Sequence, residues 1–395
     1  MLSTDRLTIG RGVTSLSTTI IKPDALSEGQ KALWAHWTFT NPQLYSPYFN
    51  LGYTELLARL CPDVYVLCIF ENGECIGFLP FQARPKSAGR IGFARPVGAP
   101  MTDYHGLISA PTTRFNLQDV LKDAGFGAFH FSAAPSTQNE LARHARTRSQ
   151  CTVMDITKGA EAWRKTRDAS YRRHLKSTRR RIKKSADLGP RKFVFQCQDE
   201  DVFSTLIEWK REKFRTTGKY DVLSVSWTRE LLQTLWSRGK EHGLWADMHV
   251  LYFGNDIAAI DLGLTDGHTF HSWMVAYNND FHTLAPGIQL LEALVDEGKN
   301  LGYKRLDLGA GIDGYKRHYA SEDISVCAGF IAAKGPAATL SRLYGSCENF
   351  GESHLGGLGK WPGKARRRYG QISACDQSLG GRAKALVQAF RPVHH

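Results

Sequence analysis

The chain has 395 residues, of which 42% are hydrophobic, and a formal net charge of +13. Its length favours two domains over one, and its composition allows the large buried cores of a soluble globular protein. No apolar run approaches the roughly 18 residues of a membrane span, and the eight cysteines form no CxxC pair, which argues against membrane-spanning, zinc-binding and disulfide-framework proteins. We therefore expect no metal site and a cytoplasmic location.

Two short patterns of the first half return in the second half. Residues 53–60 (YTELLARL) predict an amphipathic helix, and residues 64–81 after it predict a β-hairpin. Residues 227–235 (WTRELLQTL) and 249–264 repeat this helix and hairpin, and each hairpin turns at an Asn next to Gly or Asp. The repeated order predicts a duplicated α+β unit.

The duplication and the composition together suggest domain boundaries. We predict an N-terminal unit over 1–150, a basic helical connector over 151–191, and a second unit over 192–333. Residues 334–395 form a basic, Gly-rich tail, with a terminal helix predicted at 381–390.

The positive charge is concentrated in the connector, where thirteen Lys or Arg between residues 164 and 192 face only Asp168 and Asp187. The spacing of its apolar residues predicts a helix docked by one stripe, with a cationic rim around the rest (Tyr171, Leu175, Ile182, Ala186). This rim is either a solvated face or a surface that captures an anion: a phosphate-bearing donor, an anionic membrane surface or RNA. The lack of interleaved aromatic residues makes RNA the weaker choice.

Residues 281–316 read as loop, helix, strand and glycine-rich turn in one uninterrupted unit. Pro286 and Gly287 open a helix that Gly302 ends, and a short strand at 303–308 follows. The first amides of a helix point outward with the positive end of its dipole, an arrangement suited to a phosphate. We therefore expect the active site here, although an ordinary αβ unit of a mixed sheet gives the same pattern.

Four segments of the second half resemble, in order and spacing, the CelD-type acetyltransferases, a GNAT-superfamily branch found beside bacterial cellulose and exopolysaccharide genes. These segments are YRRHLKSTRRRIKKSADLG (171–189), EWKREKFRTTGKYDVL (208–223), HSWMVAYNNDFHTLAPGIQLLEAL (271–294) and YKRLDLGAGIDGYKRHYA (303–320). The branch is similar to the FemAB-type aminoacyltransferases, which carry two GNAT-like units in tandem. The resemblance implies an α/β (mixed α+β) fold of tandem GNAT-like units, each a mixed twisted sheet flanked by helices.

The resemblance also implies a co-substrate, acetyl-CoA or another acyl-CoA, and no tightly bound cofactor. The family's pyrophosphate loop has two glycines, whereas the matching segment HTLAPGIQ has one. We expect this loop to hold the donor, with help from two arginines of the connector (Ala285, Pro286, Gly287, Ile288, Arg179, Arg180).

Acyl transfer from a thioester needs positioning, proton removal and oxyanion stabilisation, and no protein nucleophile. His271 is a candidate base, and Asp307, Lys316 and Tyr315 are further candidates for catalysis. Each also has a structural explanation: a satisfied sheet histidine, a turn-capping Asp, and a Lys in a surface salt bridge. The predicted acceptor-binding residues lie on the segments around them (Trp209, Lys213, Trp273, Tyr277), although Trp209 could equally be core.

The leading hypothesis is a GNAT-type acyltransferase, of the N-acetyltransferase kind, acting on an amine or hydroxyl of a sugar-linked intermediate in polysaccharide biosynthesis. The alternatives are a FemAB-like aminoacyltransferase that uses aminoacyl-tRNA, and a non-catalytic accessory protein of a polysaccharide synthesis complex. The basic segments could also place the protein at the inner face of the membrane.

Overall fold

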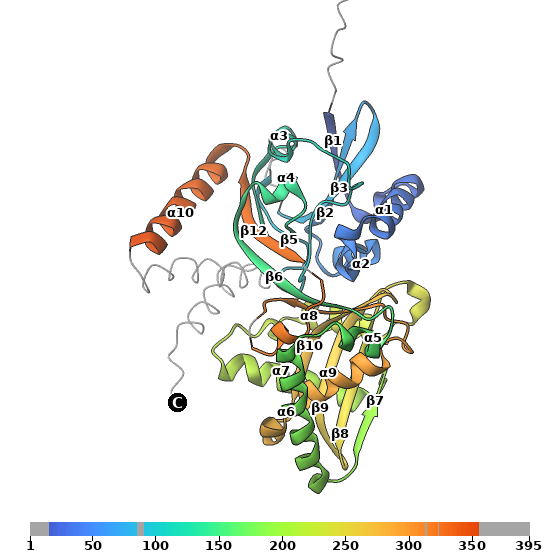
Figure 1. Cartoon of the computed structure of the whole chain (residues 1–395). Helices are drawn as coiled ribbons and strands as arrows, with labels where there is room; N and C mark the ends of the chain where they lie inside the picture. Colours follow the sequence, from blue (N-terminus) through green and yellow to red (C-terminus); the bar gives the residue numbers. More distant parts are fainter. Residues whose placement is uncertain (1–15, 85–90, 313, 323, 355–395) are drawn as a thin grey trace, which may run out of the picture.

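The computed structural model describes residues 16–84, 91–312, 314–322 and 324–354. Figure 1 shows one unit above another, with the long strand β6 (Ala145–Asp155) running from the upper unit into the lower one. Within these residues, no helix combines the length and the apolar character needed to cross a membrane.

The two units have the same order of elements. The first consists of β1 (Leu16–Ile21), α1 (Glu28–Thr40), α2 (Leu51–Leu60), β2 (Val64–Glu71), β3 (Glu74–Gln82), β4 (Ile91–Ala94), α3 (Leu117–Asp123), β5 (Phe126–Pro135) and, after the short α4 (Asn139–Ala142), β6. The second consists of β7 (Arg191–Val194), α7 (Glu200–Thr216), α8 (Ser226–Ser237), β8 (Trp245–Phe253), β9 (Asp256–Thr265), β10 (Thr269–Tyr277), α9 (Pro286–Glu297), β11 (Arg305–Ala310) and β12 (Ser325–Ala332). This repeated order confirms the predicted duplication.

Both hairpins turn at the short segments that the sequence indicated, where residues adopt positive φ values. In the first, Asn72 and Gly73 adopt φ values of 52° and 87°, the left-handed conformations that a tight turn between β2 and β3 requires. In the second, Gly254 has a φ of 58° between β8 and β9. Both predicted hairpins and both preceding helices, α2 and α8, are therefore confirmed.

The units exchange their last strands. The larger sheet has the order β4-β5-β12-β6-β11-β10-β9-β8-β7, and β1-β2-β3 form a separate sheet. Strand β12 of the second unit pairs with β5 and β6, while the end of β6, over 151–155, pairs with β11. The domain boundaries predicted near 150 and 333 remain a proposal; strand β6 crosses the first of them.

Among the described residues, α5, α6 and α10 lie outside the two repeated units. The connector holds α5 (Ala160–Lys165) and α6 (Ala169–Ser185), which confirms its predicted basic helix. Residues Gly335–His354, where the sequence predicted a Gly-rich tail, form α10, which packs on β4, β5 and β12. The terminal helix predicted at 381–390 lies outside the described residues.

One hydrophobic core joins the two units. It includes Trp34 and Tyr48 of the first unit and Leu231 and Leu262 of the second, each less than 5% exposed. Because apolar burial is the largest favourable term in folding, this shared core fixes the units against each other. Side chains from both can therefore form one site.

Candidate active site

Strands β10 and β11 are parallel neighbours that separate after three residues. Their pairing joins residues 269–271 to residues 305–307 and ends at His271 and Asp307. On its other side, β10 carries a bulge against β9, because the register jumps between Ser272 and Met274 and leaves Trp273 as the extra residue. Beyond His271 and Asp307, β10 and β11 therefore no longer pair with each other, and a slot opens between the two strands.

A cavity of about 1230 Å³ lies at this opening. Its wall in the second unit comes from α7, β10 and β11 and from the turn after β11 (Lys210, Ser272, Trp273, Val275, Leu308, Gly309, Ala310, Tyr315, Lys316). The first unit contributes β4, β5 and the loop over 95–103, and α10 closes one side. The cavity is thus built by both units.

A chain of polar groups links the two units at the cavity. Nε2 of His271 lies 2.9 Å from Oδ2 of Asp103, and Nδ1 of His271 lies 3.4 Å from Oδ2 of Asp307. The Tyr104 hydroxyl and the Gly309 amide donate to Oδ1 of Asp307, at 3.1 and 2.7 Å. His271 and Asp307 are buried, whereas the side chain of Asp103 is 47% exposed and lines the cavity. The Asp103 carboxylate therefore faces the cavity, and the buried His271 and Asp307 hold it in place from the protein interior.

The charges in this chain stabilise one another. Burial alone would lower the pKa of His271, but the negative charge of Asp307 and the hydrogen bond with Asp103 outweigh burial and raise it to about 9. Burial opposes ionisation of Asp307, yet the His271 cation lowers the pKa of that carboxyl below its usual range. At neutral pH His271 is therefore a cation beside the Asp307 carboxylate.

Two predicted residues complete this end of the cavity. Nζ of Lys316 donates to the carbonyl oxygen of Leu308 at 2.5 Å, and burial lowers the pKa of this lysine. Tyr315 lines the cavity beside it, and burial raises the pKa of its hydroxyl to about 12. Tyr315 therefore holds its proton at neutral pH.

A second group of polar residues lies on the same, second-unit side of the cavity. The Ser272 hydroxyl donates to the carboxylate of buried Asp261 at 2.8 and 3.0 Å, and burial raises the pKa of Asp261 to about 6. Nζ of Lys210 lies 3.4 Å from the carbonyl oxygen of Val275, and burial lowers the pKa of Lys210. Lys210 brings a positive charge to the cavity wall that the sequence did not suggest.

Helix α9 begins where the sequence predicted, directly after Ala285, which has a φ of 51°. No side chain caps this end and its first turn has no acidic residue. The loop predicted to bind the phosphate has three backbone amides, those of Ala285, Gly287 and Ile288. The amides of Ala285 and Ile288 already donate to the carbonyl oxygens of His282 and Ala285, inside the turn itself. A Cβ on Gly287 would lie 4.0 Å from Val275 and from Tyr277, which places the helix start beside the cavity wall.

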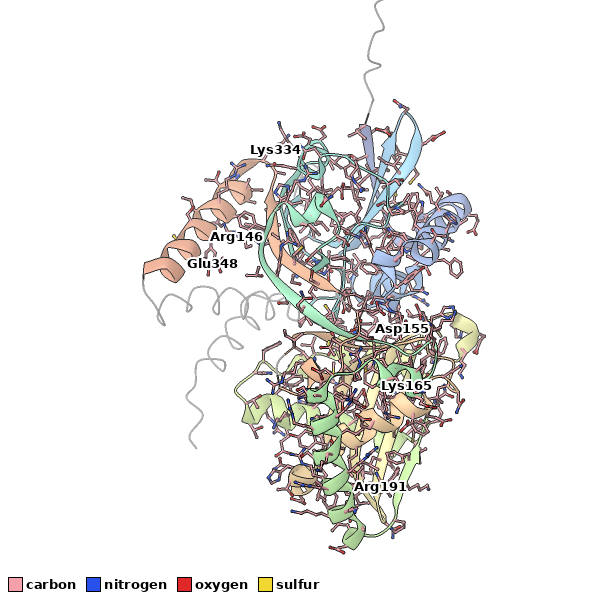
Figure 2. All side chains as sticks on the ribbon, in the orientation of Figure 1. Arg146, Asp155, Lys165, Arg191, Lys334 and Glu348 are labelled. Carbon is pink, nitrogen blue, oxygen red and sulfur yellow. The ribbon has the colours of Figure 1, made fainter. Side chains whose placement is uncertain are left out.

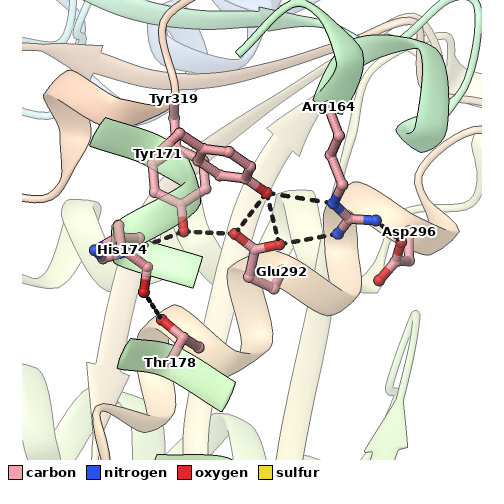
Figure 3. A network of polar contacts seen from close by, with 7 residues as sticks. All are labelled: Arg164, Tyr171, His174, Thr178, Glu292, Asp296 and Tyr319. Atoms are coloured by element: carbon pink, nitrogen blue, oxygen red, sulfur yellow. Dashed lines mark hydrogen bonds and ion pairs between the residues drawn. The ribbon is translucent and has the colours of Figure 1, made fainter. Parts of the chain in front are cut away.

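A buried network ties the basic helix α6 to α9 (Figure 3). The carboxylate of Glu292 on α9 accepts hydrogen bonds from the hydroxyls of Tyr171 and Tyr319, at 3.1 and 2.8 Å, and pairs with Arg164 at 2.9 Å. Arg164 also pairs with Asp296. Helix α6 thereby packs on the 3-10 helix η8 (Asn279–Leu284), which leads into α9, and holds the exposed side chains of Arg179 and Arg180 on its outer side.

The structure brings together only part of the predicted set. Trp273, Tyr315 and Lys316 line the cavity, and His271 and Asp307 lie directly behind it. The remaining predicted residues do not line it (Trp209, Lys213, Tyr277, Arg179, Arg180, Ala285, Pro286, Gly287, Ile288). Trp209 instead packs against the shared core, and Lys213 is exposed.

Asp103, Tyr104 and Lys210 are the site residues that sequence reasoning missed. Asp103 and Tyr104 lie in a Pro- and Gly-rich segment, PVGAPMTDYHG over 96–106, whose composition indicates an ordered loop. Lys210 follows Phe203 and Leu206 by seven and four residues, so it continues the buried stripe of α7. That spacing is the signal by which Lys210 could have been found.

Residues 172–317 match the sequence model of the acetyltransferase (GNAT) domain. Over these residues the chain is therefore similar to GNAT acetyltransferase domains, and its described residues form a mixed α/β fold of two units with the same order of elements. No curated protein matches the sequence.

Several solved structures are similar to about four fifths of the chain. The crystal structure of FemX has a TM-score of 0.50 and 10% identity, over 83% of this chain and 99% of FemX. A tandem GNAT protein from the clavulanic acid biosynthesis pathway gives 0.47 and 10%, over 81% and 99%. The C-terminal domain of a putative lysylphosphatidylglycerol synthetase from Agrobacterium fabrum gives 0.44 and 12%, over 80% and 96%.

Proposed function

We propose that this protein is an acyltransferase that moves an acyl group from acyl-CoA, most simply acetyl-CoA, to an amine or hydroxyl of a sugar-linked intermediate in polysaccharide biosynthesis. The matched GNAT domain supports the reaction class. The polysaccharide setting rests on the resemblance of the four sequence segments to CelD-type proteins. Acyl-CoA would be a co-substrate, with no tightly bound cofactor.

One observation carries the proposal: β10 and β11 separate at His271 and Asp307, directly in front of a carboxylate from the other unit. A thioester lying in the slot would place its carbonyl beside the bulged residue Trp273, whose amide can stabilise an oxyanion. The pyrophosphate of the donor would lie at the start of α9, against the Gly287 amide and the positive end of the helix dipole.

We assign the base to Asp103. The sequence suggested His271, but both ring nitrogens of His271 face carboxylates and its pKa is raised to about 9, so it has no free lone pair at neutral pH. In the proposed step, the acceptor nitrogen or oxygen bonds to the acyl carbon, its proton passes to Asp103, and the carbon–sulfur bond breaks. Lys316 stabilises the leaving thiolate and can supply its proton.

Calorimetric unfolding of the full chain with acetyl-CoA, longer acyl-CoAs and free CoA tests the donor assignment. A donor at about 100 times its Kd should add roughly 2.7 kcal/mol to the free energy of unfolding. A stabilisation by CoA that is clearly smaller in Gly287→Val supports the site at α9. No stabilisation by any of these ligands would reject acyl-CoA as the donor and favour an accessory role.

The exposed charge of α6 favours one second candidate, an aminoacyltransferase that takes its acyl group from aminoacyl-tRNA. Arginines and lysines cover the outer side of α6, which packs beside the entrance to α9. Retention of tRNA that weakens steeply with salt, together with no response to acyl-CoA, would select this reading. The same charges would also attract an anionic membrane surface. We propose that the protein lies in the cytoplasm, at the inner face of the membrane.

A further inference from the structure

Most charged side chains on the wall of the cavity have an oppositely charged partner. Three ion pairs, at 3.7, 3.9 and 2.9 Å, account for them (Arg95 with Asp63, Glu348 with Arg146, Asp103 with His271). Figure 2 shows Arg146 and Glu348 side by side between β6 and α10. Within the described parts of the chain, Lys210 and Lys316 pair with no carboxylate, and each contacts a backbone carbonyl oxygen instead. The wall therefore presents two ammonium groups that no acidic side chain among these residues neutralises.

Lys210 is the ammonium group that the proposed reaction leaves without a role. It is partly buried on α7, which packs on β10, and its Nζ lies 3.4 Å from the carbonyl oxygen of Val275. This distance exceeds the roughly 2.7–3.2 Å of an N–H···O hydrogen bond, and an ammonium has three N–H groups to donate. Burial lowers the pKa of Lys210, a change that two acids oppose and a neighbouring lysine reinforces (Asp261, Asp103, Lys219). An anion bound at Nζ would favour the charged form and offset the cost of its burial.

The hydroxyl of Tyr315 is a second donor in this part of the cavity. Tyr315 lines the cavity, and its ring meets that of Tyr319 edge-on, with ring centres 6.1 Å apart. Its hydroxyl has no hydrogen-bond partner among the residues that the structure describes. Burial raises the pKa of Tyr315 to about 12, and the charge of Asp261 adds to this shift; the same carboxylate acts on Lys210. The two donors therefore lie near one another, and a carboxylate or phosphate oxygen is the acceptor that such donors bind most strongly.

Helices α7 and α9 cover opposite faces of the sheet in the second unit. Leu206 of α7 belongs to the same hydrophobic core as Met248 of β8. Leu290 of α9 belongs to a different core, together with Leu251 of β8. Met248 and Leu251 are an odd number of positions apart on one strand, so they point to opposite faces. The donor pyrophosphate is proposed at the start of α9, whereas Lys210 reaches the cavity from the other face, so an anion at Lys210 belongs to the acceptor.

We propose that Lys210 and Tyr315 form a subsite for a negatively charged group of the acceptor, a carboxylate or a phosphate ester. The inference rests on the proposed function. The acceptor would be held at two points in one cavity, with its nucleophile at Asp103 and its anion at Lys210. An acceptor without an anion would leave the ammonium group uncompensated, so the subsite makes the enzyme selective for acidic acceptors.

Titration calorimetry of the full chain with sodium phosphate and with sodium acetate tests the subsite, at neutral pH and constant ionic strength. Saturating free CoA is present, so that the proposed donor site is occupied. At least one of the two anions should bind, and the tighter one identifies the group as phosphate or carboxylate. Lys210→Gln should weaken this binding at least about tenfold, as expected for the loss of a hydrogen bond to a charged group. Lys210→Arg keeps the charge and should retain most of the affinity.

Acetyl transfer to three aminosugars extends the test to the reaction. Glucosamine has no anion, glucosamine 6-phosphate has a phosphate ester, and muramic acid has a carboxylate. At least one of the two acids should have a kcat/KM about tenfold above that of glucosamine, and Lys210→Gln should remove this preference through KM. Transfer to glucosamine with no preference for either acid would overturn the proposed selectivity.

The matched control is Lys213→Gln, which removes an exposed cation from the same helix that does not line the cavity. It should leave every anion affinity unchanged. Equal anion affinities in wild type and Lys210→Gln, or no binding of either anion, would overturn the subsite. A loss of acetyl-CoA affinity in Lys210→Gln would assign the anion to the donor and overturn it as well. No response to acetyl-CoA, with Lys210-dependent anion binding intact, would instead reject the proposed function and leave the anion subsite standing.

Discussion

Helices α3 and α9 occupy the same place in the two units but begin in different ways. The start of α3 is closed, because the Asn116 side chain accepts a hydrogen bond from the Gln118 amide and Asp119 adds a negative charge to the first turn. The start of α9 has neither a side-chain cap nor an acidic residue, and Pro286 opens it. Only the end of α9 is suited to a phosphate.

The parallel strand pairs differ in the same sense. Strand β4 pairs with β5 along its whole length, from Ile91 to Ala94, whereas β10 extends six residues past its last pair with β11. The second unit has therefore kept the slot and the helix end that a donor needs. The first unit contributes Asp103, Phe93 and His130 to the other side of the same cavity. In the proposed site the two units therefore have different tasks.

The largest expected effect on activity comes from changing Asp103, the residue that the first unit contributes to the proposed chemistry. Asp103→Asn removes the proposed base with little change in size, so kcat should fall by about 10²–10⁴ in a steady-state acyl-transfer assay. The stabilisation by acyl-CoA should persist, since Asp103 does not contact the proposed donor site. Asp123→Asn, an exposed change on α3, should leave kcat unchanged. Wild-type kcat in Asp103→Asn would remove the first unit from the chemistry.

The contact between units should also appear in the pH dependence of stability. The pKa of His271 is about 9 in the folded chain, above its ordinary 6.5. The stabilisation is complete below pH 6.5 and is lost as the pH rises to about 9, with a slope of up to about 1.4 kcal/mol per pH unit. Urea unfolding between pH 6 and 10 measures this slope. It should vanish in His271→Gln and shrink in Asp103→Asn; an equal slope in all three proteins would contradict the charged chain.

A matched glycine pair compares the start of α9 with the start of α1, a helix of the first unit. Gly287 is the second residue of α9, and Gly29 is the second residue of α1 in the first unit. An added Cβ meets nothing closer than 4.0 Å at either position, so both valine variants should fold. Gly287→Val should weaken acyl-CoA binding about tenfold, or about 1.4 kcal/mol, in a titration, while Gly29→Val should not. Equal affinities would place the donor elsewhere.

The smallest effect is expected on α6. Exchange of Arg179 and Arg180 for serine removes two exposed charges that water and salt screen, so acyl-CoA affinity should fall about two- to fivefold at low ionic strength. The difference from wild type should disappear at about 1 M salt, where the Debye length is about 3 Å. A loss that persists at high salt would mean that the arginines contact the donor directly.

The sequence predicted the elements whose signals are local. The starts of α9 and α6, the helices α2 and α8 and both hairpins follow from nearby residues, such as Pro286 or Asn72 with Gly73. His271, Asp307, Lys316 and Trp273 were found because they lie in or beside that readable segment.

The rest depended on contacts that no local pattern encodes. Asp103 meets His271 across 168 residues of sequence, and β12 crosses into the other unit to pair with β5. Trp209 and Lys213 share one helix face, but Lys210, which continues the buried stripe of α7, is the residue of this helix that lines the cavity. Helical periodicity identifies faces; tertiary packing decides which of them lines a site.

The central claim is that the second unit holds the donor while the first unit supplies the base. A crystal structure of the chain with a stable thioether analogue of acetyl-CoA tests it most directly. The account predicts the pyrophosphate at Gly287, the sulfur between β10 and β11, and the acyl carbon facing Asp103. A pyrophosphate at α3, or an acyl group turned away from Asp103, would contradict it.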